Sequence, residues 1–223
     1  MPDRLRVVIA EDHYLVREGT RKLLEDSGEV EVEAAVGTAT ELKDAVRRLG
    51  PDAVITDIRM PPGHHMEGIE AAHAIRAEHP DVGVVVLSQH ADAAYALELL
   101  KDGSAGYAYL LKDRLGEIGE LLRALREVAG GGSLIDPQVV ETLVDRRRRV
   151  EQSPLSELTP RELEVLRAMA EGRTNKGIGE ALFLSESSVE KHVAAIFGKL
   201  GLAQEAQVHR RVAAVLTFLR ERD

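Results

Sequence analysis

The chain has 223 residues, 44% of them hydrophobic, and carries 38 acidic and 29 basic side chains, which give a formal net charge of −9. This length allows one or two domains with a sizeable core. The absence of cysteine excludes a disulfide framework and a cysteine-based zinc finger. No apolar run approaches the roughly 18 residues of a membrane span, and residues 1–10 lack the apolar core of a signal peptide. We therefore expect a cytoplasmic protein with no membrane partner.

Short apolar runs alternate with helical patterns over the first 130 residues. Strands are predicted at residues 6–10, 30–36, 53–56, 82–87 and 107–111. This alternation implies parallel pairing through right-handed crossovers. Residues 1–130 are therefore predicted to form an α/β domain built on a five-stranded parallel, doubly wound sheet of the flavodoxin-like type.

Charged and hydroxyl side chains stand where four of these strands end. They are Glu11, Asp12, Asp57, Ser88 and Lys112. Because ligands of such sheets gather beyond the carboxyl ends of the strands, these side chains are expected to converge. Three crowded carboxylates repel one another by roughly several kcal/mol at low effective dielectric. A hard divalent cation is therefore expected among them, and Mg²⁺ fits best.

Asp57 is the candidate nucleophile of this cluster. With Glu11 and Asp12 holding the metal, the Asp57 carboxylate can attack a phosphoryl group in line, which would give an aspartyl phosphate. Lys112 would place its ammonium on the phosphoryl oxygens, and Ser88 would donate a hydrogen bond to one of them. The residue two positions after Asp57 is Arg59, which can offer the metal only its backbone carbonyl.

The order and spacing of these residues resemble the receiver domain of two-component response regulators. Residues 103–113, GSAGYAYLLKD, resemble the fifth-strand signature of the NarL/FixJ subgroup. The resemblance covers roughly the first 130 residues. It implies that Asp57 accepts a phosphoryl group from a sensor histidine kinase, and that Tyr109, three residues before Lys112, is the switch aromatic. Ordinary strand packing is the alternative for Tyr109.

Residues 131–155 are interpreted as a jointed linker that contains a short helix at 137–150. The preceding glycine run lacks the motifs of phosphate-binding loops, which favours a hinge. The arginine run at 146–149 is interpreted as a solvated helix face near Glu141, Asp145 and Glu151, and contact with phosphates is the alternative. The pair at positions 64–65, His-His, lacks metal-ligand spacing and is expected in a surface loop.

Residues 156–223 are predicted to form a small all-α domain. Thr159, Pro160 and Glu162 make a capping box that begins a helix at residues 160–171. Thr174 can cap a second helix that ends near residue 182, and a third helix runs from about residue 186 to residue 200. Two short helices joined by a tight turn are typical of a helix-turn-helix whose second helix enters a major groove.

The third helix has two distinct faces. Its inner face is predicted to carry Val189, Val193, Ile196 and Leu200. The opposite face carries Ser187, Lys191, Ala194 and Gly198. This outer face is small, polar and carries one cation. Gly177 and Gly179 within the second helix are expected to cost roughly 1 kcal/mol each relative to Ala.

The segments LTPRELEVL (158–166), EGRTN (171–175), VEKHV (189–193) and KLGL (199–202), together with Ile196, resemble the LuxR-type helix-turn-helix domain. The resemblance covers residues 156–202 and implies double-stranded promoter DNA as a partner. It assigns Ser187, Ser188 and Lys191 to DNA from the recognition helix. It also implies backbone contacts by Thr174, Asn175, Lys176 and His192, with Lys199 as a further candidate.

Two features qualify this interpretation. Ala194 stands where some members present a base-reading lysine and Glu190 stands where others are basic, so readout is expected to depend on Lys191 and on DNA shape. Residues 153–223 carry ten acidic and ten basic side chains and are therefore neutral, although nucleic acid usually selects a basic domain.

In a final helix at 204–221, one apolar stripe is predicted to serve either core packing or dimer formation. It consists of Val208, Val212, Val215 and Leu219.

The sequence therefore predicts a DNA-binding transcriptional response regulator, not an enzyme, in which phosphate at Asp57 controls homodimerisation and promoter binding. One alternative is an interaction protein of the receiver type that works without phosphate. The other is an aspartyl-phosphate phosphatase of the haloacid dehalogenase type, which expects an acid where Arg59 stands.

Overall fold

The computed structural model describes residues 4–116, 118–202 and 209–221. The chain divides into two compact units, Met1–Val144 and Asp145–Asp223, and each is described by itself. Among the described residues, no helix is long and apolar enough to cross a membrane.

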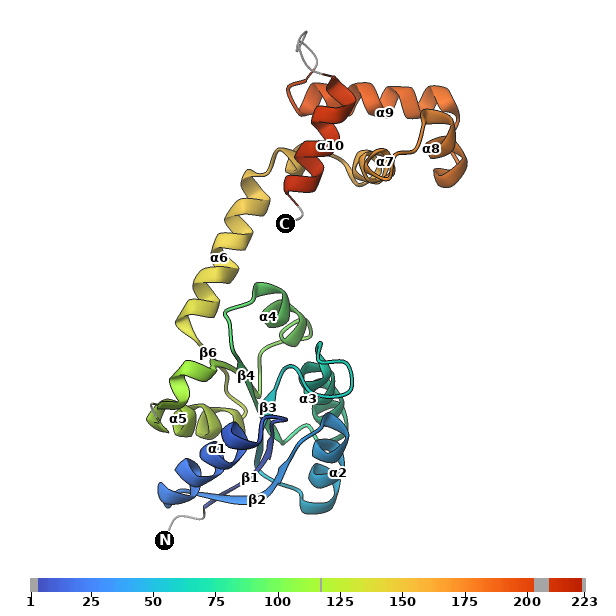
Figure 1. Ribbon diagram of the computed structural model, residues 1–223. Helices are drawn as coiled ribbons and strands as arrows, with labels where there is room; N and C mark the ends of the chain where they lie inside the picture. The colour runs from blue at the N-terminus through green and yellow to red at the C-terminus, as the bar shows by residue number, and fades with distance from the viewer. Residues whose placement is uncertain (1–3, 117, 203–208, 222–223) are drawn as a thin grey trace. The chain divides into compact units, whose positions relative to one another are not determined.

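The first unit is built on one parallel sheet (Figure 1). Its strands are β1 (Leu5–Ala10), β2 (Val30–Val36), β3 (Ala53–Asp57), β4 (Gly83–Ser88), β5 (Tyr107–Leu111) and β6 (Leu134–Ile135). They lie in the order β2-β1-β3-β4-β5-β6, and every neighbouring pair is parallel. The five expected strands are confirmed, but the predicted number was one too low, because β6 pairs with β5 at the outer edge.

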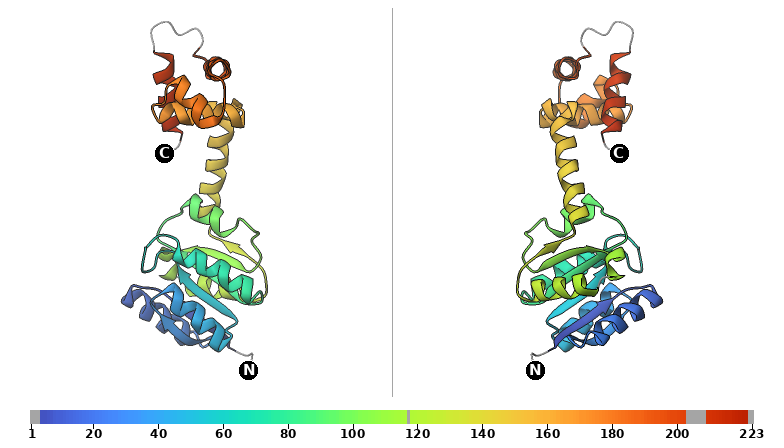
Figure 2. Two further views of the ribbon diagram at one scale, coloured as in Figure 1. Left: turned by 90° about the vertical axis from the view of Figure 1, so that its right-hand side faces the viewer. Right: turned by 90° about the vertical axis from the view of Figure 1, so that its left-hand side faces the viewer.

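Helices cover both faces of this sheet (Figure 2). One face packs against α1 (Tyr14–Asp26) and α5 (Ile118–Ala129). The other packs against α2 (Ala39–Leu49), α3 (Glu67–Glu78) and α4 (Ala93–Leu99). Because the central strands are covered on both sides, they read as continuous apolar runs, and all six residues of β4 are buried.

Two close backbone approaches require glycine. In the first turn of α3, Gly68 donates its N–H to the carbonyl of Ile58 (2.9 Å), and a Cβ at this position would overlap the carbonyl oxygen of Asp57. In the second unit, a Cβ on Gly179 would come within 2.7 Å of the carbonyl oxygen of Leu184. The cost in helix propensity that was predicted for Gly179 is therefore offset by a tight helix-turn contact.

The helix α6 (Pro137–Gln152) starts as part of the first unit. The backbone N–H of Asp136 donates to the carbonyl of Tyr109 in β5 (2.9 Å), and its carboxylate accepts from the N–H of Gln138 (2.9 Å). Val139 is fully buried in the core on the α2, α3 and α4 face. The boundary between the two units falls within α6, between Val144 and Asp145.

The second unit is all-helical, as predicted. It consists of α7 (Pro160–Ala170), α8 (Asn175–Leu182), α9 (Glu186–Lys199) and α10 (Arg210–Arg220). The capping box of Thr159 and Glu162 is present at the start of α7, and Thr174 and Ser185 cap α8 and α9. The predicted inner face of α9 is confirmed, because Val189, Val193 and Ile196 are buried in the core of this unit.

The inner face of α10 differs from the predicted stripe. Ala214 and Phe218 are the buried residues of this helix, whereas Val212 is 52% exposed and Leu219 is 46% exposed. Val208 of the same stripe lies outside the described residues. Val215 packs against the core of this unit, so of the two alternatives left open, core packing is confirmed for Val215 and is wrong for Val212 and Leu219.

We expect Gly68→Ala to destabilise the first unit by about 1–3 kcal/mol, because the added methyl group would push α3 away from the end of β3. Gly19→Ala in α1 is the matched control, since open space surrounds its Cβ, and should stabilise by up to about 1 kcal/mol. All four tyrosines lie in the first unit, so urea unfolding followed by tyrosine fluorescence reports on that unit. Equal midpoints for the two variants would contradict the close contact.

Candidate functional site

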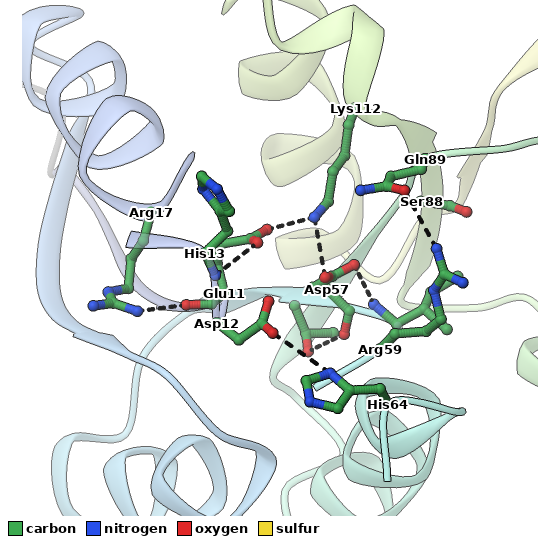
Figure 3. A network of polar contacts seen from close by, with 12 residues as sticks. Glu11, Asp12, His13, Arg17, Asp57, Arg59, His64, Ser88, Gln89 and Lys112 are labelled. Atoms are coloured by element: carbon green, nitrogen blue, oxygen red, sulfur yellow. Dashed lines mark hydrogen bonds and ion pairs between the residues drawn. The ribbon is translucent and has the colours of Figure 1, made fainter. Parts of the chain in front are cut away.

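The side chains predicted to meet at the carboxyl edge of the sheet do so. Glu11 follows β1, Asp57 ends β3, Ser88 ends β4, and Lys112 follows β5 in a short 3₁₀ turn. Together with Asp12 they line a cavity of about 550 Å³ (Figure 3). The neighbouring positions of β1, β3, β4 and β5 in the sheet bring these residues together, although up to 101 positions separate them along the chain.

Three carboxylates crowd one side of this cavity. Glu11, Asp12 and Asp57 each place an oxygen within 4.8 Å of the others. Glu11 is only 3% exposed, and burial raises the pKa of its carboxyl group, to which the charge of Asp57 adds, although a hydrogen bond from Lys112 acts in the opposite direction. Oxygen donors at these separations fit a hard divalent cation, which would relieve their repulsion.

Among the described residues, Lys112 is the one lysine or arginine whose side chain contacts these three carboxylates. Its Nζ lies 2.7 Å from Oε2 of Glu11 and 3.0 Å from Oδ2 of Asp57, and its side chain is 13% exposed. The ammonium therefore bridges two of the three acids and leaves the four groups with a net negative charge. Asp57 is held on its other oxygen, because Oδ1 accepts a hydrogen bond from the N–H of Ile58 (2.8 Å).

Ser88 is buried at the predicted position but is bonded within its own loop. Its hydroxyl donates to the carbonyl of His90 (2.7 Å) and accepts from the N–H of the same residue (3.3 Å). The hydroxyl of Tyr109, which is fully buried, donates to the same His90 carbonyl (3.4 Å). Burial raises the pKa of Tyr109. Two of the predicted site residues therefore share one acceptor.

His64, Gln89 and the carbonyl of His90 were not assigned to this site from the sequence. Nδ1 of His64 lies 3.5 Å from Oδ2 of Asp12, so His64 borders the cavity, while 55% of its side chain remains exposed in the expected surface loop. Oε1 of Gln89 accepts a hydrogen bond from the guanidinium of Arg59 (3.3 Å, Figure 3). The carbonyl of His90 is a backbone group, so no side-chain pattern could have revealed it.

In the second unit, most predicted DNA contacts lie on the surface of α8 and α9. Thr174, Lys176, Ser187 and Lys191 are exposed, whereas Asn175, Ser188 and His192 are partly exposed. Hydroxyl groups gather at the N-terminus of α9, where Oγ of Ser185 lies 3.2 Å from Oγ of Ser187 and 2.8 Å from Oγ of Ser188. Free N–H groups and hydroxyls at a helix N-terminus favour contact with phosphate.

Two of the predicted DNA contacts are engaged inside the unit. Nζ of Lys199 donates to Oε2 of Glu162 (2.6 Å), and this bond lowers the pKa of Glu162. Oδ1 of Asn175 accepts from Nη1 of Arg211 in α10 (2.9 Å). These bonds tie α7 to the end of α9, and α8 to α10. They disfavour Lys199 as a contact to DNA and leave Asn175 with only its amide N–H₂ group for that role.

Comparison with known proteins matches both units. The family model for the response regulator receiver domain matches residues 7–125. The model for bacterial regulatory proteins of the luxR family matches residues 156–212. The chain is 36% identical to the transcriptional regulatory protein DegU of Brevibacillus brevis, over 92% of this chain and 91% of DegU.

Two further relatives agree over nearly the whole length. The nitrate/nitrite response regulator protein NarP of Escherichia coli is 34% identical, over 97% of this chain and 95% of NarP. The solved complex of the two-component response regulator RcsB with DNA has a TM-score of 0.59 and 26% identity, over 98% of this chain and 99% of that chain. The chain therefore belongs to the transcriptional response regulators that join a receiver domain to a luxR-family DNA-binding domain.

Proposed function

We propose that Asp57 accepts a phosphoryl group from a phosphohistidine of a sensor histidine kinase, and that this phosphate controls promoter binding. The bridge that Lys112 makes between Asp57 and Glu11 is the observation that carries this proposal. A carboxylate oxygen of Asp57 attacks phosphorus, the bond from phosphorus to the histidine nitrogen breaks, and an aspartyl phosphate forms. The ammonium of Lys112 then moves from carboxylate to phosphoryl oxygen.

Glu11, Asp12 and Asp57, with the backbone carbonyl of Arg59, are the proposed ligands of Mg²⁺. When bound, the ion would offset the charge of the phosphoryl oxygens. The side chain of Arg59 occupies the position where a phosphatase of the haloacid dehalogenase type requires a second acid, and the relatives are transcriptional regulators. We therefore propose signalling by a long-lived phosphate in place of catalytic turnover.

The His90 carbonyl, which accepts from both Ser88 and Tyr109, would link phosphate at Asp57 to the control of DNA binding. If the Ser88 hydroxyl turns to a phosphoryl oxygen, it leaves the His90 carbonyl to Tyr109 alone, and the loop before α4 shifts with it. A differential stabilisation of about 3 kcal/mol would change the ratio of active to inactive protein by roughly 100-fold. The exposed stripe of Val212, Leu216 and Leu219 on α10 is the proposed contact between two copies on DNA.

Recognition of promoter DNA is assigned to the exposed side of α8 and α9. Lys191, Ser187 and Ser188 are proposed to reach base edges and neighbouring phosphates in the major groove. Thr174, Lys176 and His192 are proposed to bind the backbone, with Asn175 contributing its N–H₂ group. The receiver at residues 1–130, the linker at 131–155 and the DNA-binding domain at 156–223 remain the proposed functional division.

Asp57→Asn should abolish labelling by acetyl phosphate or by a kinase in the presence of Mg²⁺, because an amide is a poor nucleophile and carries no charge for the metal. Mass spectrometry that locates the phosphate on the intact protein tests this. Asp52→Asn is a suitable control, since this acid lies at the opposite end of β3 and should label normally. Undiminished labelling of Asp57→Asn would contradict the assignment of Asp57 as the phosphate acceptor.

Lys112→Ala should bind Mg²⁺ about threefold more tightly or better, because the ammonium competes with the ion for Glu11 and Asp57. The same variant should lose the phosphate-dependent gain in DNA binding. Calorimetric titration with Mg²⁺ measures the first effect. Lys101→Ala, which removes an exposed lysine paired with Glu98, should leave Mg²⁺ affinity unchanged. Weaker Mg²⁺ binding by Lys112→Ala would contradict the competition.

Lys191→Ala should weaken binding to a selected operator by about 1–3 kcal/mol and relax preference at one or two base pairs. Lys176→Ala should weaken binding to all sequences alike and reduce the salt slope by about one unit. Titrations of operator and scrambled duplexes at several salt concentrations separate the two outcomes. Equal losses on both duplexes for Lys191→Ala would remove this residue from base readout.

A further inference from the structure

The second half of α6 carries four consecutive arginines, at positions 146–149. They belong to the same compact unit as the helix-turn-helix, because that unit begins at Asp145. All four side chains are exposed. Residues 145–223 contain 14 basic and 12 acidic side chains, so without these arginines the unit would be net negative. The run therefore supplies the positive charge that a DNA-binding unit otherwise lacks here.

The four arginines are not equivalent. Nε of Arg147 pairs with Oε1 of Glu151 (2.8 Å), and Nη1 of Arg148 pairs with Oδ1 of Asp145 (3.8 Å). Arg146 and Arg149 have no ion-pair partner among the residues that the structure describes. Residues three apart are neighbours on a helix surface, so these two guanidinium groups share one face. The acids of α6 thus balance one pair of arginines and leave the other pair available.

We infer that Arg146 and Arg149 form an accessory phosphate-binding face, which holds the DNA backbone outside the base pairs read by α9. The inference rests on the proposed DNA-binding function. The guanidinium group offers a planar fork of donors that matches phosphate oxygens. Contacts of this kind carry no sequence information and contribute affinity and salt dependence. This face would add to the non-specific attraction that Lys176 gives the helix-turn-helix domain, which is neutral by itself.

Two double variants of the full-length chain test the inference. Arg146→Ala/Arg149→Ala removes the unpaired arginines, and Arg147→Ala/Arg148→Ala removes the paired ones. Both variants lose two positive charges and gain helix propensity. Arg147→Ala/Arg148→Ala also removes the two ion pairs to Glu151 and Asp145, which are exposed and contribute little to stability. Circular dichroism should show equal helix content. A third variant, Arg146→Lys/Arg149→Lys, keeps the charge.

The probe is a fluorescein-labelled random-sequence duplex of about 30 base pairs, titrated at several salt concentrations with acetyl phosphate and Mg²⁺ present. For Arg146→Ala/Arg149→Ala, we expect the slope of log affinity against log salt to fall by about 1.8 units per bound chain. Affinity near 0.1 M salt should fall at least about tenfold. The Arg147→Ala/Arg148→Ala slope should change by less than about 0.5 units, and the lysine variant should retain most of the wild-type slope.

Equal changes in the two alanine pairs would overturn the inference, because they would reduce the effect to net charge. An unchanged slope for Arg146→Ala/Arg149→Ala would also overturn it and would return the run to the role of a solvated helix face. A wild-type chain that binds no duplex under these conditions would overturn the proposed function, and the inference with it. The first two outcomes leave DNA binding by the helix-turn-helix intact.

Discussion

Repulsion among Glu11, Asp12 and Asp57 is the constraint on which the first unit depends. Their oxygens lie within 4.8 Å of one another at the end of a buried sheet, where like charges interact strongly. Lys112 neutralises part of this charge, and the packed strands β1, β3 and β5 hold all four groups in place. Core packing therefore maintains an arrangement that is electrostatically unfavourable by itself, and any cation or phosphoryl group that enters changes the balance.

A change in the charge balance of this cavity would be transmitted through backbone carbonyl groups. The carbonyl of His90 accepts from both Ser88 and Tyr109, while the carbonyl of Tyr109 accepts from the N–H of Asp136 at the start of α6. The loop after Ser88 and the N-terminal end of α6 are therefore both hydrogen-bonded to the same residue of β5, Tyr109. Tyr109 and Asp136 are buried, so leaving the Tyr109 hydroxyl or the Asp136 N–H without its acceptor would cost about 1–3 kcal/mol.

The sequence was most informative where local pattern and sheet geometry act together. Apolar runs located the five main strands, and parallel pairing then required Glu11, Asp57 and Lys112 to meet. Two-residue β6 escaped prediction because its apolar run is too short to distinguish from a linker. The bond from Lys199 to Glu162 spans 37 positions, so no local pattern indicates it. On α10, helical periodicity identified an apolar stripe but not which side of the helix faces the core.

The first half of α6 and the segment just before it also determine where this chain can be divided. The predicted end of the first domain, residue 130, lies before β6, Asp136 and the buried Val139. A fragment that stopped there would turn β5 into an edge strand with unpaired N–H and C=O groups and would uncover the apolar surface beneath Val139. Exposed edges of this kind pair readily with other chains. Gene fusions and single-domain fragments of this protein should therefore be joined or cut within the exposed second half of α6, beyond Val144.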